Sequence, residues 1–222
     1  MQPAIRIKFL QKAFKTISDE GLFIFLRKAI KLMAFNIFRV RRVIIYELAL
    51  ENHEGKILPE IEISFRPARR ADIESMSVEL FGYNHKATQY SLERLDQGDE
   101  CILAVHNGLI AGYVWIMKDS MELSQFRHIR VPKDKAYIYN GFVLKEFRGK
   151  RILNALDGYV IEKLKREGKK FLIATVAHDN KPPIKAQERI GFKKVGEIIG
   201  LKALGYQYSY IPKKSLDYIT KE

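Results

Sequence analysis

One stretch of the chain decides the expected fold: Tyr137-Ile-Tyr-Asn-Gly-Phe-Val-Leu-Lys-Glu-Phe-Arg-Gly-Lys-Arg-Ile-Leu153. A strand is expected to end at Val143-Leu144, and the loop Arg148-Gly149-Lys150-Arg151 then leads directly into a helix. The start of a helix presents unpaired backbone N–H groups and the positive end of the helix dipole. The glycine allows a tight turn, and three cations surround it. The pattern predicts a cradle for a pyrophosphate; a solvated basic turn that starts a helix is the alternative interpretation.

The pattern of apolar residues on both sides of this stretch alternates between strand and helix periods. Asn107-Gly108 joins two apolar runs, Cys101–Val105 and Ile110–Met117, and is a strong hairpin signal. Phe171–Ala177 is a nearly continuous apolar run, which is typical of a strand buried on both faces. The other expected elements are strands at Glu60–Arg66, Ala136–Leu144, Lys193–Ile199 and Leu204–Ile211, and helices at Asp72–Phe81, Arg151–Glu167 and Lys181–Ile190. A hairpin followed by strand–helix–strand predicts an α/β (α+β) protein with a mixed, mostly antiparallel sheet flanked by helices.

The N-terminal segment differs from the rest of the chain in charge. The 222 residues carry a formal net charge of +13, and ten Lys or Arg residues against three acidic ones precede residue 51. Ser18 is a suitable N-cap for a helix in which Leu22, Leu26, Ile30, Met33 and Ile37 share one face, opposite Arg27, Lys28 and Lys31. We therefore expect a basic amphipathic helical extension over residues 1–50, with a short strand at Val43–Leu48, a polar linker at 51–59 and the main domain at 60–222.

The extension has two interpretations. Its apolar face packs against the main domain or against a second copy in a homodimer, or it contacts an anionic membrane surface peripherally. No segment is apolar over the roughly 20 residues that a bilayer requires, and no signal peptide is evident. The single cysteine, Cys101, opens an apolar run, so we expect a buried side chain rather than a nucleophile, and a cytoplasmic protein.

Three segments in order resemble the GNAT N-acetyltransferase superfamily. Arg148 to Leu153 resembles the family's Arg/Gln-x-x-Gly-x-Gly/Ala loop after a strand that ends in Val. Downstream, Asn180 to Phe192 resembles the segment Asn-x-x-Ala-x-x-x-Tyr-x-x-x-Gly-Phe. Upstream, Ile63 to Ile73 looks like the family's opening strand and first helix. The resemblance covers residues from about 60 to 211 and leaves out the first 50.

The resemblance implies an acyl-CoA site. Backbone groups of Phe142, Val143 and Leu144 would pair with the pantetheine arm, where two parallel strands move apart. An amide near Val143 would polarise the thioester carbonyl as an oxyanion donor, and Asn180 would bind the cofactor arm. The pyrophosphate would be held by N–H groups of Arg148, Gly149, Lys150, Arg151, Ile152 and Leu153. The resemblance implies no metal, acetyl-CoA as cosubstrate, and direct attack by an amine.

The sequence departs from the family pattern at two places. Arg151 and Leu153 replace the small residues usual in the phosphate loop. Gln187 stands where the family has a tyrosine that commonly protonates the departing thiolate, and an amide cannot supply that proton. Tyr139, on the strand beside the expected thioester, is the preferred candidate acid among Tyr137, Tyr139, Tyr206 and Tyr208. The candidate bases are Glu79, Glu100, His106, His128 and His178, and their spacing selects none of them.

Three functions follow in order of preference. The first is an N-acyltransferase that moves an acetyl or other short acyl group from acyl-CoA to an amine. The second, favoured by Gln187, is a catalytically weak GNAT-like module that binds acyl-CoA. The third is a basic nucleic-acid-binding protein. The third ranks last because the positive charge gathers on one amphipathic helix and no nucleic-acid-binding motif is recognised.

Overall fold

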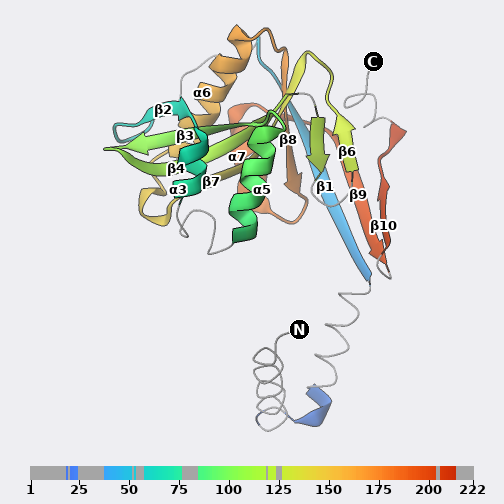
Figure 1. Ribbon diagram of the computed structural model, residues 1–222. Coiled ribbons are helices and arrows are strands. Elements are labelled where there is room, and N and C mark those ends of the chain that lie inside the picture. The colour runs from blue at the N-terminus through green and yellow to red at the C-terminus, as the bar shows by residue number, and fades with distance from the viewer. Residues whose placement is uncertain are drawn as a thin grey trace.

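The computed structural model describes residues 19, 21–24, 38–51, 53, 58–76, 85–118, 120–123, 127–203 and 206–213. In this part of the chain, eight strands form one sheet (Figure 1). Their spatial order is β10 (Tyr206–Tyr210), β9 (Lys193–Ala203), β1 (Phe38–Ala49), β8 (Phe171–Ala177), β7 (Lys135–Val143), β4 (Leu109–Met117), β3 (Glu100–His106) and β2 (Ser64–Pro67). The β7–β8 pair is parallel and the other neighbouring pairs are antiparallel. The expected mixed, mostly antiparallel sheet is confirmed.

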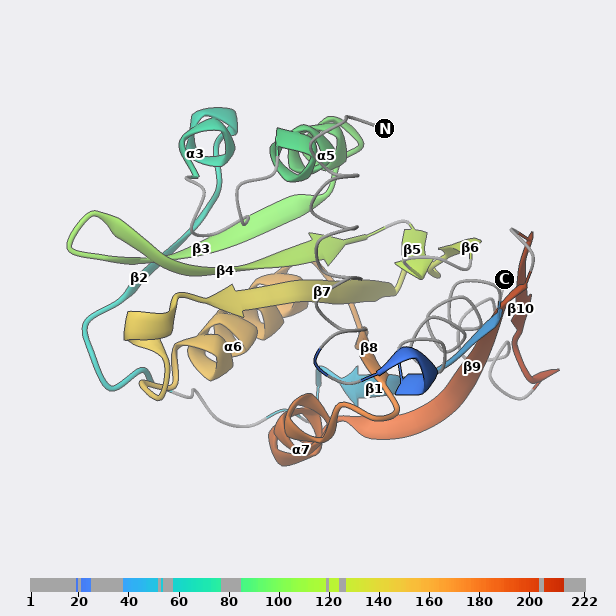
Figure 2. The same ribbon diagram turned by 90° about the horizontal axis from the view of Figure 1, so that it is seen from below.

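Helices cover both faces of the sheet (Figure 2). One face carries α6 (Ile152–Arg166) and α7 (Lys181–Ile190), and the other carries α3 (Arg70–Ser75) and α5 (His85–Asp96). The smaller elements are a hairpin of β5 (Ser120–Leu123) and β6 (Arg127–Arg130), and the short 3-10 helix η1 (Lys145–Phe147). Of the helices in the described part of the chain, none has the length and apolar composition that crossing a bilayer requires.

The central strand–helix–strand unit follows the sequence pattern closely. Leu156, Val160 and Leu164 of α6 are fully buried against the sheet, as the spacing of apolar residues predicts. Gly168 follows the end of α6 with φ 75°, a backbone conformation that glycine adopts without a steric penalty. At the expected hairpin, Asn107 and Gly108 have φ values of 48° and 80°, as a two-residue turn of the primed type requires.

Strand β1 is longer and more central than the sequence indicates. The expected strand Val43–Leu48 is part of β1, which runs from Phe38 to Ala49 and pairs antiparallel with β8 on one side and β9 on the other. Ile45 and Tyr46 are buried at 0% and 1% exposure. Residues 38–49 therefore form a strand of the central sheet, in which β1 lies between β8 and β9.

Other predicted elements differ in extent or fall outside the described residues. The helix expected at Asp72–Phe81 is α3, which begins at Arg70; the Asp72 carboxylate caps its first turn by accepting the Arg69 N–H at 2.6 Å. Helix α5, the β5–β6 hairpin and η1 were not predicted. Most of the amphipathic helix expected after Ser18 lies outside the described residues; within them, Leu22–Ile24 are helical and exposed. The division of the chain at residues 50 and 60 stays a prediction.

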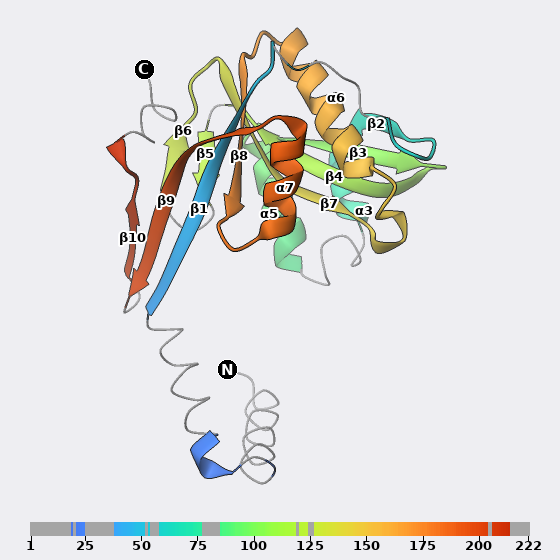
Figure 3. The same ribbon diagram turned by 180° about the vertical axis from the view of Figure 1, so that it is seen from behind.

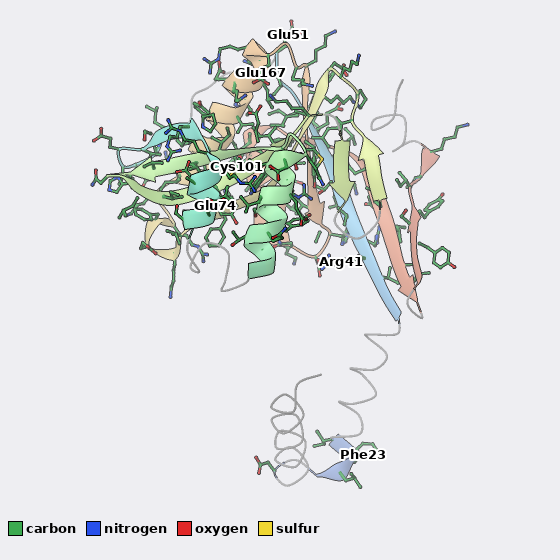
Figure 4. The ribbon with its side chains drawn as sticks, in the orientation of Figure 1. Phe23, Arg41, Glu51, Glu74, Cys101 and Glu167 are labelled. Atoms are coloured by element: carbon green, nitrogen blue, oxygen red, sulfur yellow. The ribbon has the colours of Figure 1, made fainter. Side chains whose placement is uncertain are left out.

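Cys101 has the buried environment that the sequence predicts. It lies on β3 among Ile73, Leu103 and Trp115, on the face that α3 covers (Figure 4). Burial raises the pKa of its thiol well above the ordinary value, so the reactive thiolate is strongly disfavoured.

Candidate functional site

The two parallel strands of the sheet separate along their length. Strands β7 and β8 pair from Lys135↔Phe171 to Ile138↔Ala174, and β7 then continues to Val143 and β8 to Ala177. A cavity of about 340 Å³ opens beyond the last pair. We call it the strand cleft. Residues of β7, β8, α6 and α7 line it, among them Ile138, Gly141, Leu153, Asp157, Asn180 and Gln187. Figure 3 shows α6 and α7 lying over this region from the same side.

A bulge in β7 shapes one wall of the strand cleft. On β4, Tyr113 pairs with Phe142 and Trp115 with Tyr139, so β7 holds one residue more than β4 over this interval. Asn140, in the bulge, has a left-handed φ of 50°. A bulge interrupts the ladder and turns the strand locally. The backbone of β7 is thereby redirected where the strand cleft begins.

Backbone groups of Val143 face away from β4, toward the side where β7 and β8 no longer pair. The N–H of Leu144 donates to the Ala111 carbonyl at 2.9 Å, so the backbone of Leu144 faces β4. Successive residues of a strand direct their N–H and C=O groups to opposite sides, so those of Val143 face away from β4. In agreement, the Val143 carbonyl accepts a hydrogen bond from Arg148 Nε at 3.1 Å. The N–H of Val143 therefore points away from β4, and its role as an oxyanion donor stays a prediction.

The expected phosphate loop lies at the start of α6, and its last residue, Leu153, lines the strand cleft. Gly149 and Arg151 both have left-handed φ values, 81° and 57°, and Arg151 is the N-cap residue without a side-chain cap. The first N–H groups of α6 are thus left for a ligand or solvent. The side chains of Arg148 and Arg151 are exposed, and Arg148 lies 5.6 Å from the centroid of the Phe142 ring. Left-handed residues, free amides and cations at a helix N-terminus form a site suited to an anion.

Leu153 and Gly141 narrow the strand cleft from opposite walls. A Cβ atom added at Gly141 would lie 2.9 Å from Leu153 Cδ1, which is closer than ordinary packing allows. The glycine on β7 therefore leaves the space that the leucine on α6 occupies. This packing accounts for the large residue at 153, where the family pattern has a small one.

Two residues of α7 complete the other wall. Asn180 is the N-cap of α7, makes no side-chain cap bond and lines the strand cleft, and its contact with the cofactor arm stays a prediction. Gln187 lines it too, and its Oε1 atom is buried without a hydrogen-bond partner among the described residues. The position of the family's tyrosine therefore does face the strand cleft in this chain.

Asp157 is a site residue that the sequence analysis missed. It lies on α6, is 7% exposed and lines the strand cleft, and burial raises the pKa of its carboxyl to about 7. A signal was present: Asp157 is four residues after Leu153 and three before Val160, so it interrupts the apolar face of α6 with an acid.

Tyr139, the preferred candidate acid, makes a hydrogen bond on the α5 side of the sheet. Its hydroxyl donates to Asp99 Oδ2 at 2.6 Å, and Asp99 also pairs with the buried Arg94 guanidinium at 2.9 Å. The ring belongs to the apolar cluster of Trp115, opposite the α6 face. Burial, followed by the hydrogen bond to Asp99, raises the pKa of the Tyr139 hydroxyl above its ordinary value. Its acid role stays a prediction, with the proton already engaged by Asp99.

The candidate bases whose side chains the structure describes do not line the strand cleft. Glu100 pairs with Lys118 and Lys163, and His106 Nδ1 lies 2.7 Å from the Glu62 carbonyl oxygen. His178 is exposed after β8. The side chains of Glu79 and His128 lie outside the described residues. In the described part of the chain, no group of three or more His, Cys, Asp or Glu side chains is placed to hold a metal ion.

Several solved structures share the fold of this chain. A Drosophila protein superimposes with a TM-score of 0.55 at 15% identity, over 82% of this chain and 58% of its own. A GCN5-related N-acetyltransferase from Sphaerobacter thermophilus superimposes with a TM-score of 0.54 at 20% identity, over 83% of this chain and 56% of its own. A Novosphingobium aromaticivorans structure assigned to the GNAT family superimposes with a TM-score of 0.50 at 13% identity, over 72% of this chain and 63% of its own. The chain thus spans less than two thirds of each of these structures, and the likeness concerns the fold.

A family comparison covers more than half of the sequence. No curated protein matches the chain. The sequence model of the acetyltransferase (GNAT) family matches residues 63–192, which include β2, the strand cleft and the phosphate loop. The chain therefore belongs to the acetyltransferase (GNAT) family.

Proposed function

We propose that this protein is an N-acyltransferase that moves an acetyl or other short acyl group from acyl-CoA to an amine. The observation that carries the proposal is the separation of β7 and β8 beside the uncapped N-terminus of α6. An extended pantetheine arm needs a narrow channel with free backbone groups, and a pyrophosphate needs the amides at a helix start. The strand cleft and the phosphate loop supply these two environments side by side.

In the proposed complex, each part of the acyl-CoA molecule contacts a different group of residues. The amides of residues 148–153 hold the pyrophosphate, and the backbone of β7 from Phe142 to Leu144 runs beside the pantetheine arm. Asn180 contacts the arm from α7. The N–H of Val143 donates to the thioester carbonyl oxygen and stabilises the negative charge that develops there when the amine attacks. The carbon–sulfur bond then breaks, and the products are an amide and CoA with a free thiol.

Reversal of one charge tests the placement of the pyrophosphate. Arg148→Glu is expected to weaken CoA binding about tenfold or more, because an anion replaces a cation beside the phosphates. Lys213→Glu changes the overall charge equally and lies outside the loop, so it should leave the affinity nearly unchanged. Isothermal titration of CoA into both variants measures the difference. Equal weakening by the two would mean that only overall charge matters and would remove Arg148 from the site.

Turnover decides between an enzyme and a binding module. Release of free thiol from acetyl-CoA should be accelerated by at least one member of a panel of small amines, aminosugars, peptides and protein lysines. The module is favoured by the glutamine at 187, which cannot act as the acid. Firm CoA binding without thiol release for any amine would support the module and contradict the transferase.

A further inference from the structure

The strand cleft contains an ionisable group that the mechanism above leaves unused. Asp157 lies one helical turn after Leu153 on the same face of α6, and both line the strand cleft. Helix α6 follows β7 and returns along it, so a step from Leu153 to Asp157 leads from the phosphate loop toward the closed end, where Ile138 and Ala174 still pair. An acyl group at the far end of a pantetheine arm would lie in this direction.

Gln187 faces the same cavity from α7. It replaces the family's tyrosine, so the departing thiolate needs another proton donor. Its Oε1 atom is buried and without a partner among the described residues. An amide can accept or donate a hydrogen bond but cannot give up a proton at neutral pH. Two side chains from different helices therefore line the strand cleft. Gln187 on α7 presents an amide at the position of the family's acid, and Asp157 on α6 presents a carboxyl group that is able to release a proton.

We propose that Asp157, in its protonated form, is the acid that protonates the sulfur of CoA as it leaves. This inference rests on the proposed transferase function. In the step, the bond between the carbonyl carbon and sulfur breaks, and its electron pair goes to sulfur. The Asp157 O–H bond breaks, and its proton forms the CoA thiol. Water then returns a proton to the Asp157 carboxylate, and the proton lost by the attacking amine goes to solvent.

The surroundings of Asp157 suit this role. Burial raises the pKa of its carboxyl to about 7, because the charged form loses its contact with water. A free thiol has a pKa near 8.5, so transfer of a proton from such a carboxyl group to a thiolate is favourable. Tyr139 is the other titratable residue that lines the strand cleft, and its hydroxyl donates to Asp99 on the opposite face. The lining residues of β4, β8 and α7 are uncharged.

The test compares Asp157→Asn with the unchanged chain and with Glu162→Gln, an exposed position on the same helix. With the amine that gives the highest turnover, kcat of Asp157→Asn should fall about 100-fold near pH 7, at the lower limit of general-acid effects. The dissociation constant for CoA should change less than about threefold, because the lost group acts at the leaving step. Glu162→Gln should behave like the unchanged chain.

The pH profile separates an acid from a structural residue. In the unchanged chain, kcat should decline as pH rises through the pKa of Asp157, because the proton to be donated is lost. This alkaline decline should be absent in Asp157→Asn and retained in Asp157→Glu, which keeps a carboxyl group and also serves if the asparagine variant folds poorly. An unaltered profile in Asp157→Asn would overturn the proposal. So would a profile that loses its decline only in Tyr139→Phe. Absence of thiol release by the unchanged chain would instead refute the transferase function itself.

Discussion

Replacing Ile45 by alanine is expected to lower the free energy of unfolding by about 2–5 kcal/mol. Ile45 precedes the region matched by the family, yet it is 0% exposed in β1 and packs with Met117, Tyr137 and Ile173. Truncation removes buried methyl groups and leaves a cavity in this cluster, because the side chains of a strand point out of the plane of the sheet. Urea unfolding followed by circular dichroism measures the change.

Val40 provides a matched control on the same strand. It is 51% exposed, so Val40→Ala should change stability by no more than about 0.5 kcal/mol. If the two substitutions cost the same, β1 does not form part of the core. The sequence before residue 50 would then be an appendage, as the division at that residue had suggested.

Replacing Asp157 by asparagine is expected to stabilise the protein at alkaline pH and to have a smaller effect at acidic pH. Burial raises the pKa of the carboxyl from 3.8 to about 7, so the native state binds its proton more tightly than the unfolded chain does. Stability from this linkage is fully present below the unfolded pKa. It declines as pH rises between the two values and is constant above the folded pKa. Over this interval of roughly three units the cost amounts to about 4 kcal/mol.

The measurement is the difference in unfolding free energy between Asp157→Asn and the unchanged chain, from near pH 4 to near pH 8. It should grow in favour of the variant up to about pH 7 and then level off. Glu162→Gln, on the same helix but exposed, should give a flat difference. A flat difference for Asp157→Asn as well would mean that the carboxyl group titrates normally and is not desolvated in the strand cleft.

Elements with strong local signals could be predicted from the sequence. Strand β8 and helix α7 have the predicted bounds because a nearly continuous apolar run and a terminal glycine mark them locally. The role of β1 was not evident, since Arg39, Arg41 and Arg42 interrupt its apolar pattern and its partners lie more than a hundred residues away. Helix α5 was missed because its composition is largely polar, and Leu92 and Leu95 are its leucines that pack against the sheet.

The candidate site was partly predictable for the same reasons. The phosphate loop has a local signature, Arg148-Gly149-Lys150-Arg151, and the structure places it at the start of α6. The hydrogen bond of Tyr139 to Asp99 and the contact of Leu153 with the space beside Gly141 depend on how distant segments meet. Asp157 could have been found as an acid within an apolar helix face, but only the structure shows that this face borders a cavity.

Isothermal titration with CoA tests the central claim most directly, namely that the strand cleft is an acyl-CoA site. The unchanged chain is expected to bind one CoA per chain with micromolar affinity. Gly141→Phe, whose side chain would displace Leu153 into the strand cleft, should abolish binding, while Leu109→Phe, at a position 65% exposed on β4, should not. Absence of binding by the unchanged chain at millimolar CoA, or undiminished binding by Gly141→Phe in a cooperatively folded protein, would contradict the account.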